Sequence, residues 1–325
     1  MNEQISTDPL FGTQPQAFLV TGGTGFIGQR LTAALLAAGH AVTILSRQQP
    51  APGTVHAPGL DFVSDLGQLP RDAAVDIVIN LAGARILGLP WTRGRRKTLL
   101  ASRVGVTQRL VHWIAGATHK PRLLISASAI GYYGVQAPGD DQWLGEDSPP
   151  QPVFMSELCQ AWEQAAAGAS AHGVAVACLR FGLVLGDGGA LPMLLLPVRL
   201  GLGGRLGGGE QWMSWVHIDD LLRAMAHVAL HHAPGSVGAW NVTAPRAVRQ
   251  IEFSRAAAAV LHRPAFLPTP GWPMRLALGE QADLLLGGQR VAPARLVAQG
   301  FRFVHPELAG TLAALCQKPL PVQDA

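Results

Sequence analysis

Cysteine, lysine and tyrosine are all scarce in this 325-residue chain. The three cysteines, Cys159, Cys178 and Cys316, lie far apart and form no CxxC pair, so the sequence suggests neither a zinc site nor a disulfide framework. We therefore name no metal ligand, and a reducing cytoplasmic compartment fits best. The two tyrosines stand side by side in the segment SASAIGYYG, where any tyrosine-dependent chemistry has to lie.

Long apolar runs and a strong charge excess are also missing. No stretch of about 18 uninterrupted apolar residues occurs, and no sorting signal is visible, so we expect a soluble protein that contacts no membrane. The 25 basic and 21 acidic residues give a net charge of only +4, too little for a dedicated nucleic-acid binder. The expected partner is a small-molecule substrate, and the chain itself is expected to be a monomer or homodimer.

Apolar runs alternate with helical stretches through the first half of the sequence. The runs at 17–21, 41–45, 75–80, 123–126 and 174–181 are predicted strands, with helices at about 99–115 and 154–171. This alternation predicts an α/β fold with a doubly wound parallel sheet covered by helices on both faces.

Beyond Gly186 the composition changes, because proline and glycine multiply and six glycines fall within 201–209. Residues 1–16 read as a flexible tail and 17–185 as a nucleotide-binding domain, to which 213–232 return. The segments 186–212 and 233–320 would form a smaller interleaved C-terminal cap, in which 240–242 is a candidate for a short strand.

Gly22, Gly25 and Gly28 follow the first strand with GxxGxxG spacing and stand where a helix begins. Glycine permits the tight turn and lets the backbone approach a pyrophosphate, whose charge is favoured by free N–H groups at the helix N-terminus. In this context the spacing predicts a dinucleotide site, and an ordinary strand-to-helix turn is the alternative.

Ser46-Arg47 ends the second strand, where an NAD site usually carries an acidic residue. A cation there suits the 2′-phosphate of NADP, and the missing acid argues against S-adenosylmethionine. The alternative is an ordinary exposed arginine. We expect NADP(H) as the cofactor.

Four motifs in chain order resemble the extended short-chain dehydrogenase/reductase superfamily: TGGTGFIG, NLAG, SASAIGYYG and LRFGLVLG. Other segments, among them RILGLPWTRGRRK, FMSELCQAWE and WMSWVHIDDL, are similar to an atypical epimerase-family branch that ends in its own small C-terminal domain. The resemblance covers about Phe18 to Leu315.

The resemblance implies a Rossmann core that binds NADP. The implied cofactor contacts are Gly22, Thr24, Gly25, Phe26, Ile27, Arg47, Asp65, Leu66, Leu81, Ala82 and Gly83. Asp65-Leu66 would lie near the adenine and Leu81 to Gly83 near the ribose. Ser128 matches the active-site serine of the superfamily, which faces the nicotinamide; the alternative is a buried serine bonded to backbone.

The tyrosine and lysine of that superfamily are missing at their usual positions. Aligned on FMSELCQAWE, Val153 and Glu157 stand in their place. Valine has no proton to give, and a glutamate cannot stabilise a phenolate as an ammonium group does.

Two hypotheses remain open. In the first, the chain is an NADP(H)-dependent oxidoreductase or epimerase in which Tyr132 or Tyr133 supplies the acid beside Ser128, helped by Lys97 or Arg103. Against this, one tyrosine could pack in the core while the other caps a turn. In the second, the chain binds NADP(H) without hydride chemistry, as a regulator; some members of the resembled branch carry a cell-division label.

His217 and Asp219 resemble a segment that closes over substrate in extended enzymes, but we expect His217 to pack and Asp219 to cap a helix. Arg180, at the end of its strand, is either an anion clamp or an arginine with no specific role.

Overall fold

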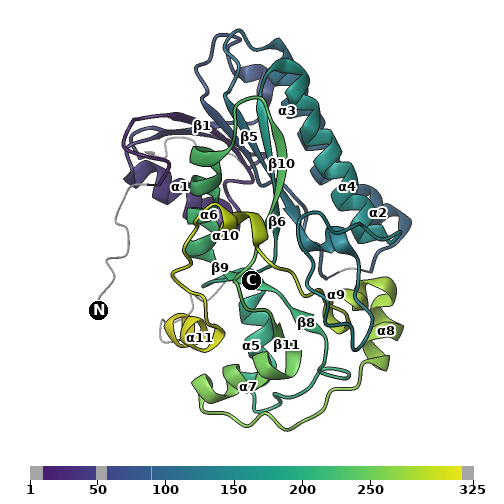
Figure 1. Cartoon of the computed structure of the whole chain (residues 1–325). Helices are drawn as coiled ribbons and strands as arrows, with labels where there is room; N and C mark the ends of the chain where they lie inside the picture. The colour runs from purple at the N-terminus through teal and green to yellow at the C-terminus, as the bar shows by residue number, and fades with distance from the viewer. Residues whose placement is uncertain (1–9, 49–56, 89, 317–325) are drawn as a thin grey trace.

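Seven parallel strands form the central sheet of the computed structural model, which describes residues 10–48, 57–88 and 90–316. The strands are β1 (Ala17–Thr21), β2 (Ala41–Leu45), β3 (Leu60–Val63), β4 (Ile77–Asn80), β5 (Leu123–Ala129), β6 (Ala175–Phe181) and β10 (Val237–Val242). Their spatial order is β10-β6-β5-β4-β1-β2-β3. Successive strands are added on one side of β1 up to β3 and then on its other side from β4 to β10, so the order of strands reverses between β1 and β4. Figure 1 shows β5, β6 and β10 next to one another in this sheet. This is the predicted doubly wound α/β fold, and such a reversal is where α/β proteins bind ligands.

Helices cover both faces of the sheet because successive residues of each strand point to opposite sides. In β1, Phe18 and Val20 pack with α1 (Phe26–Ala37) and α6 (Ile218–His231) in one core cluster. Leu19 packs on the other face with α3 (Val106–Gly116) and α4 (Phe154–Ala167). A helix α2 (Arg93–Leu100) runs through a π-helical turn (Ala101–Gly105) into α3.

Two strands of the sheet differ from the prediction. β3 carries no apolar run long enough to be noticed in the sequence. β10 begins at Val237 and pairs in parallel with β6 over its whole length, so 237–242 belong to the sheet, although the sequence suggested only 240–242 as a strand and placed them in the cap. Burial of Trp240 and Val242 in the core explains the pairing.

The start of the described chain is packed, whereas the sequence predicted a flexible tail over 1–16. Phe11 is 1% exposed and meets Phe18 edge to face, with ring centres 5.0 Å apart. The Gln16 side-chain amide donates to the Phe11 carbonyl at 2.9 Å. Residues 10–16 are therefore tied to the core; the rest of the predicted tail lies outside the described residues.

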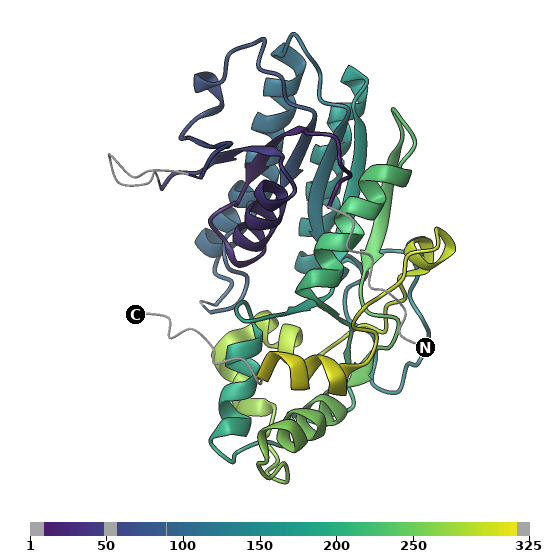
Figure 2. The ribbon, with the colours of Figure 1, turned by 90° about the vertical axis from the view of Figure 1, so that its left-hand side faces the viewer.

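The second half of the chain builds a smaller unit beyond the carboxyl ends of the strands (Figure 2). Its core is formed by α5 (Leu191–Arg199), α7 (Gln250–Leu261) and α11 (Leu308–Cys316), and α8 (Trp272–Leu278) and α9 (Asp283–Leu286) also belong to this unit. The short helix α10 (Ala294–Ala298) packs instead against β10, and its Leu296 belongs to the core of the sheet. Two short strand pairs, β7 (Leu183–Leu185) with β9 (Trp215–His217) and β8 (Trp212–Met213) with β11 (Val248–Arg249), connect this unit to the sheet. His217, rather than Asp219 as the sequence predicted, caps α6, since its Nδ1 accepts the Asp219 N–H at 3.1 Å. Within the described residues, every helix is too short or too polar to span a lipid bilayer.

Candidate functional site

Two glycines at the junction of β1 and α1, Gly22 in the loop and Gly28 in the first turn of α1, are required by close contacts with the protein's own backbone. Gly22 has φ +69°, and a Cβ added there would lie 2.7 Å from the Leu81 carbonyl oxygen. A Cβ on Gly28 would lie 2.2 Å from the Gly22 carbonyl oxygen. Both contacts are far inside van der Waals range, so the fold itself excludes a side chain at either position.

Gly25 is different, because its backbone conformation suits any residue and an added side chain would meet one tight contact rather than a clash. Its φ is −80°, and an added Cβ would meet only the Gly22 carbonyl oxygen, at 3.3 Å. Gly25 is the N-cap of α1, no side chain caps this helix end, and its first turn contains no acidic residue. The unpaired N–H groups of the turn form a cradle for an anion, and a side chain at Gly25 would obstruct close approach of a pyrophosphate.

The loop after β4 lies directly against the glycine loop. Leu81 donates its N–H to the Thr21 carbonyl at 3.1 Å, and Ala82 donates to the Thr21 hydroxyl at 3.2 Å. A Cβ on Gly83 would lie 3.0 Å from the guanidinium carbon of Arg103. Burial lowers the pKa of Arg103, which lies beside this loop and donates to the Ala84 carbonyl at 3.1 Å.

Phe26 joins the glycine loop to a second glycine-rich turn after β7. Added Cβ atoms at Gly186, Gly188 and Gly189 would lie 2.5, 2.8 and 2.9 Å from the Phe26 ring. The ring therefore packs flat against backbone that only glycine can present. Thr24 is exposed at the tip of the first loop and Ile27 is half-buried behind it.

Three further predicted cofactor residues follow the ends of β2 and β3. Arg47 is exposed just past β2. Asp65 caps the short 3₁₀ turn Leu66–Gln68, and its carboxylate accepts the Gly67 N–H at 2.8 Å. Leu66 is 9% exposed and packs in the core, so its side chain has a structural role.

The predicted catalytic segment meets a row of buried polar side chains on three neighbouring strands. Ser128 on β5 is in register with Arg180 on β6, and Arg180 is in register with Asn241 on β10. Paired positions in parallel strands present their side chains on the same face. All three residues are at most 4% exposed.

Glu163 of α4 connects this row. The Ser128 hydroxyl donates to its carboxylate at 2.7 Å, and Arg180 donates Nε and Nη2 to its two oxygens at 2.8 and 2.9 Å. Burial alone would lower the pKa of Arg180, but the Glu163 carboxylate outweighs this and raises it. Arg180, for which the sequence left two roles open, is thus a permanent buried cation in a bidentate pair.

Both tyrosines contact this cation, and their rings also meet each other edge to face, with ring centres 5.4 Å apart. Tyr133 is 1% exposed, donates its hydroxyl to Asn241 Oδ1 at 2.7 Å and accepts from Arg180 Nη1 at 3.0 Å; burial raises its pKa. Tyr132 is half-buried, with its ring centre 3.4 Å from the guanidinium carbon of Arg180. Among the described residues no hydrogen bond involves the Tyr132 hydroxyl, so it is the tyrosine hydroxyl still able to serve a ligand.

Val153 and Glu157 take no part in this network. Val153 is the exposed N-cap of α4, and Glu157 lies in the exposed part of the first turn. Of the two proposed helpers, Lys97 is exposed on α2 and Arg103 lies against the Gly83 loop. The cation beside the tyrosines is Arg180 instead.

Sequence reasoning missed Glu163 and Asn241. The signal for Glu163 was its spacing, since it follows Ser156 by seven residues and so shares the inward face of α4 with it. Asn241 stands between two apolar residues of a strand that was only partly recognised, and no local signal marked it.

A cavity of about 410 Å³ opens between the segment that follows Tyr133 and the C-terminal unit. Its walls include Val135, Gly207, Trp212, Arg249 and Trp272. The Arg249 guanidinium lies 3.7 Å from the centre of a Trp212 ring, which fixes both side chains. The cavity is close to the tyrosines in sequence and has two indole rings that suit a small organic molecule.

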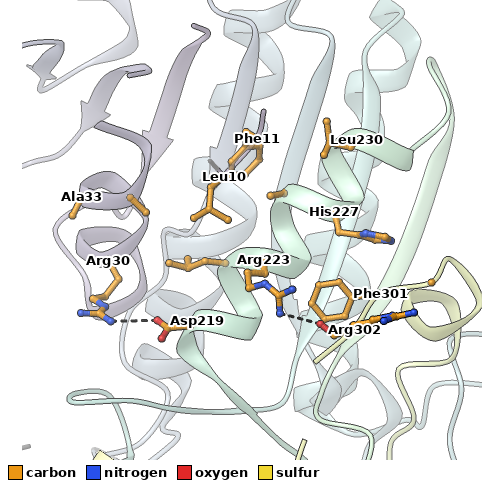
Figure 3. A pocket seen from close by; sticks show the side chains of 14 residues that line it. Leu10, Phe11, Arg30, Ala33, Asp219, Arg223, His227, Leu230, Phe301 and Arg302 are labelled. Carbon is orange, nitrogen blue, oxygen red and sulfur yellow. Dashed lines mark hydrogen bonds and ion pairs between the residues drawn. The ribbon is translucent and has the colours of Figure 1, made fainter. Parts of the chain in front are cut away.

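A larger hollow, about 760 Å³, lies between α1 and α6 (Figure 3). Arg30 and Asp219 form an ion pair at its edge, 3.2 Å apart. None of the predicted cofactor or catalytic residues lines it. This hollow is therefore separate from the glycine loop and the polar row.

Known proteins share this architecture. Epimerase family protein YfhF of Bacillus subtilis is 38% identical over 299 residues, covering 91% of this chain and 96% of the relative. The chloroplastic SDR39U1 homolog of Arabidopsis thaliana is 37% identical over 92% of this chain and 86% of its own length. The crystal structure of human epimerase family protein SDR39U1 with NADPH has a TM-score of 0.80 and 36% identity, covering 93% of this chain and 100% of that one.

Two family patterns divide the sequence. Residues 269–315 match a domain of unknown function termed DUF1731, in keeping with the predicted C-terminal domain. The human relative was crystallised with NADPH, the cofactor that Arg47 predicts. Residues 18–243 match the NAD dependent epimerase/dehydratase family, and on this match and the identities to its relatives the chain belongs to that family.

Proposed function

We propose that the protein is an NADP(H)-dependent oxidoreductase or epimerase of a small molecule, with its chemistry at Ser128 and Tyr132. The observation that carries the proposal is Gly25 at the open N-terminus of α1, where the fold opposes an added Cβ by only one tight contact, at 3.3 Å, and not by a clash as at Gly22 and Gly28. A ligand that must approach the backbone there explains it. The polar row on β5, β6 and β10 stands at the same edge of the sheet.

The residues of the glycine loop hold the cofactor. The free N–H groups at the start of α1 bind the pyrophosphate, and Arg47 past β2 binds the 2′-phosphate that distinguishes NADP from NAD. When bound, the nicotinamide supplies or accepts a hydride.

Tyr132 supplies or removes the proton on the substrate oxygen, and Arg180 takes the role of the absent lysine. A guanidinium 3.4 Å from the ring centre stabilises negative charge that develops on the phenol oxygen. Glu163 holds Arg180 in place by two hydrogen bonds and offsets part of its charge. Ser128 turns its hydroxyl from Glu163 to the substrate oxygen when the site is occupied.

The small molecule would enter the cavity of about 410 Å³ beside Val135. Trp212 and Trp272 give it apolar walls. Arg249 and Arg275 give two cations, each already paired with a carboxylate, Asp141 and Asp283 respectively. An apolar, ring-containing carbonyl or alcohol substrate fits this lining better than a small charged one.

The decisive experiment is a panel of carbonyl and alcohol compounds, followed by absorbance of NADPH and NADP at catalytic protein concentration. The proposal expects at least one compound to give turnover that is lost in Tyr132→Phe, while NADPH affinity, measured by calorimetry, stays at the wild-type value. Turnover that survives in Tyr132→Phe would refute the assigned acid.

A second candidate function is a regulator that binds NADP(H) without hydride chemistry. It is favoured because the hydrogen-bonding groups of the polar row already have partners inside the protein. The hydroxyls of Ser128 and Tyr133 both donate to partners inside the protein. In this case no compound of the panel changes NADPH absorbance, yet NADPH binds tightly and alters amide hydrogen exchange in the C-terminal unit. Tight binding with no change in exchange would count against the regulator.

A further inference from the structure

Arg103 is a half-buried cation that the proposed mechanism does not use. Among the residues that the structure describes, no carboxylate forms an ion pair with it. Its Nη2 donates to the Ala84 carbonyl at 3.1 Å and its Nη1 to the Ser102 hydroxyl at 3.4 Å, and both acceptors are neutral. Because the sequence contains no acidic residue from Ile77 to Gly139, the surrounding segment offers no counter-charge.

The other groups near Arg103 do not supply the missing negative charge. Burial lowers the pKa of Arg103, and the nearby Arg95 cation lowers it further. An ionised Cys159 thiolate would favour the cation, but burial raises the pKa of this thiol to about 12, so it is neutral near pH 7. The Glu163 carboxylate is already bound by Arg180 through two hydrogen bonds. Such an unpaired guanidinium is costly to the protein unless a ligand brings the anion.

A buried network fixes the backbone that carries Arg103. The residue lies in the π-helical turn between α2 and α3, and such turns often occur at functional sites. The fully buried Thr107 hydroxyl donates to the Arg103 carbonyl at 2.8 Å. The same hydroxyl accepts from Asn80 Nδ2 at 2.8 Å and from Trp162 Nε1 at 3.1 Å. The turn is therefore anchored to the core and holds the cation in place without a ligand.

Arg95 of α2 brings a second half-buried cation to the same loop. Its Nη2 donates to the Arg85 carbonyl, which is next in the chain to the Ala84 carbonyl that Arg103 contacts. The Nε of Arg95 is buried and has no hydrogen-bond partner among the described residues. Two guanidinium groups close together repel each other, and an oxyanion bound by both would remove this repulsion and accept their free N–H groups.

The loop that the two arginines contact connects the cofactor loop to the C-terminal unit. A Cβ on Gly83 would lie 3.0 Å from the Arg103 guanidinium carbon, so a glycine there lets the cation approach the predicted ribose position. At the other end, the Gln281 side chain donates to the Ile86 carbonyl at 2.7 Å, and α2 lies beside α8 and α9 (Figure 1). Both of these helices contribute walls to the cavity of about 410 Å³.

We propose that Arg95 and Arg103 form an anion site that takes a carboxylate or phosphate group of the substrate. This inference rests on the proposed function, because it adds an anionic group to the ring-containing carbonyl or alcohol assigned to the cavity. The proposed function already places the phosphates of the cofactor at the start of α1 and at Arg47, so the anion belongs to a second ligand. Guanidinium groups bind carboxylate and phosphate through pairs of hydrogen bonds, which also orient the bound molecule.

The test is calorimetric titration of the full-length protein, saturated with NADPH, at constant ionic strength. The probes are inorganic phosphate and, in a parallel titration, sodium benzoate as an aromatic carboxylate. Saturating NADPH fills the cofactor site, so each probe reports on a separate site. The probe that binds more tightly identifies the kind of anion that the site prefers.

We expect one probe anion per chain, and affinity at least about tenfold weaker in Arg103→Met and in Arg95→Met, because each loses a charge-assisted hydrogen bond. The matched control is Arg93→Met, which removes an exposed cation from the same helix and should leave the affinity unchanged. The saturating anion should raise the unfolding temperature of the wild-type protein but not of Arg95→Met. NADPH affinity should be the same in all four proteins.

Turnover provides a second reading once a substrate is found. Compounds with a carboxylate or phosphate should have a kcat/KM at least about tenfold above that of their methyl esters, and Arg103→Met should remove this preference by raising KM.

Unchanged anion affinity in both arginine variants, an equal loss in Arg93→Met, or weaker NADPH binding in Arg103→Met would overturn the assignment. Anion binding is measured without turnover, so a failure here is distinct from a failure of the proposed function.

Discussion

The glycine loop and the polar row lie at the same edge of the sheet but are built in opposite ways. The loop takes its shape from contacts among Gly22, Gly25 and Gly28, and leaves N–H groups unpaired on its open side. The polar row joins side chains from Ser128 to Asn241, and its charges and hydroxyls are paired inside the protein. The loop offers unpaired N–H groups to a negatively charged ligand. The row instead contains the Arg180 cation, which Glu163 already pairs.

The largest expected effect comes from breaking the ion pair in the row. Arg180→Met leaves the Glu163 carboxylate buried without its partner and should lower the free energy of unfolding by about 3 to 5 kcal/mol, measured by urea denaturation. Adding Glu163→Gln removes the uncompensated charge and should recover part of this loss. If the double variant is no more stable than Arg180→Met, the pair does not act as a unit.

A pair of glycine variants separates folding from binding in the loop. Gly28→Ala forces a Cβ to within 2.2 Å of a carbonyl oxygen, and we expect a loss of about 1 to 3 kcal/mol in stability. Gly25→Val should keep the fold and weaken NADPH at least about a hundredfold, or about 2.7 kcal/mol. Thermal unfolding measures the stability of each variant, and calorimetry measures its NADPH affinity. An unchanged NADPH affinity in folded Gly25→Val would show that the glycine loop does not bind the pyrophosphate.

The same contrast explains what the sequence could reveal. The glycine loop is local, so seven consecutive residues between a strand and a helix were enough to predict it. Glu163 meets Ser128 across 35 positions and Tyr133 meets Asn241 across 108, so neither contact is visible in a short window. β10 was half recognised for the same reason, because its pairing with β6 depends on packing across the sheet.

Hydroxyl variants sharpen the distinction between the tyrosines. If the protein turns over a substrate, Tyr132→Phe and Ser128→Ala should each cut turnover on the order of a hundredfold with little change in NADPH affinity. Tyr133→Phe should leave turnover near wild type but lower stability by about 1 to 3 kcal/mol, since Asn241 Oδ1 loses its buried donor.

The exposed Glu157 is the control for these kinetics, and Glu157→Gln should have little effect. Turnover is measured by steady-state kinetics and stability by urea denaturation for Tyr132→Phe, Ser128→Ala, Tyr133→Phe and Glu157→Gln. A dead Tyr133→Phe of wild-type stability would reverse the two roles, and a dead Glu157→Gln would move the active site back to the position of the missing tyrosine and lysine.

The smaller of the expected effects on cofactor binding lies just past β2, where the proposed function assigns one exposed side chain, Arg47, to the 2′-phosphate of NADP. Arg47→Ala should weaken NADPH by about 1.5 to 3 kcal/mol, roughly tenfold or more, because a charge-assisted hydrogen bond to the 2′-phosphate is lost. NADH has no such phosphate and should bind as before. Calorimetric titration of both cofactors at two salt concentrations gives the test, since added salt screens an exposed charge pair and should narrow the difference in the wild-type protein but not in Arg47→Ala. Equal losses for NADPH and NADH would mean that Arg47 supports the loop as a whole, and the preference for NADP would then need another residue.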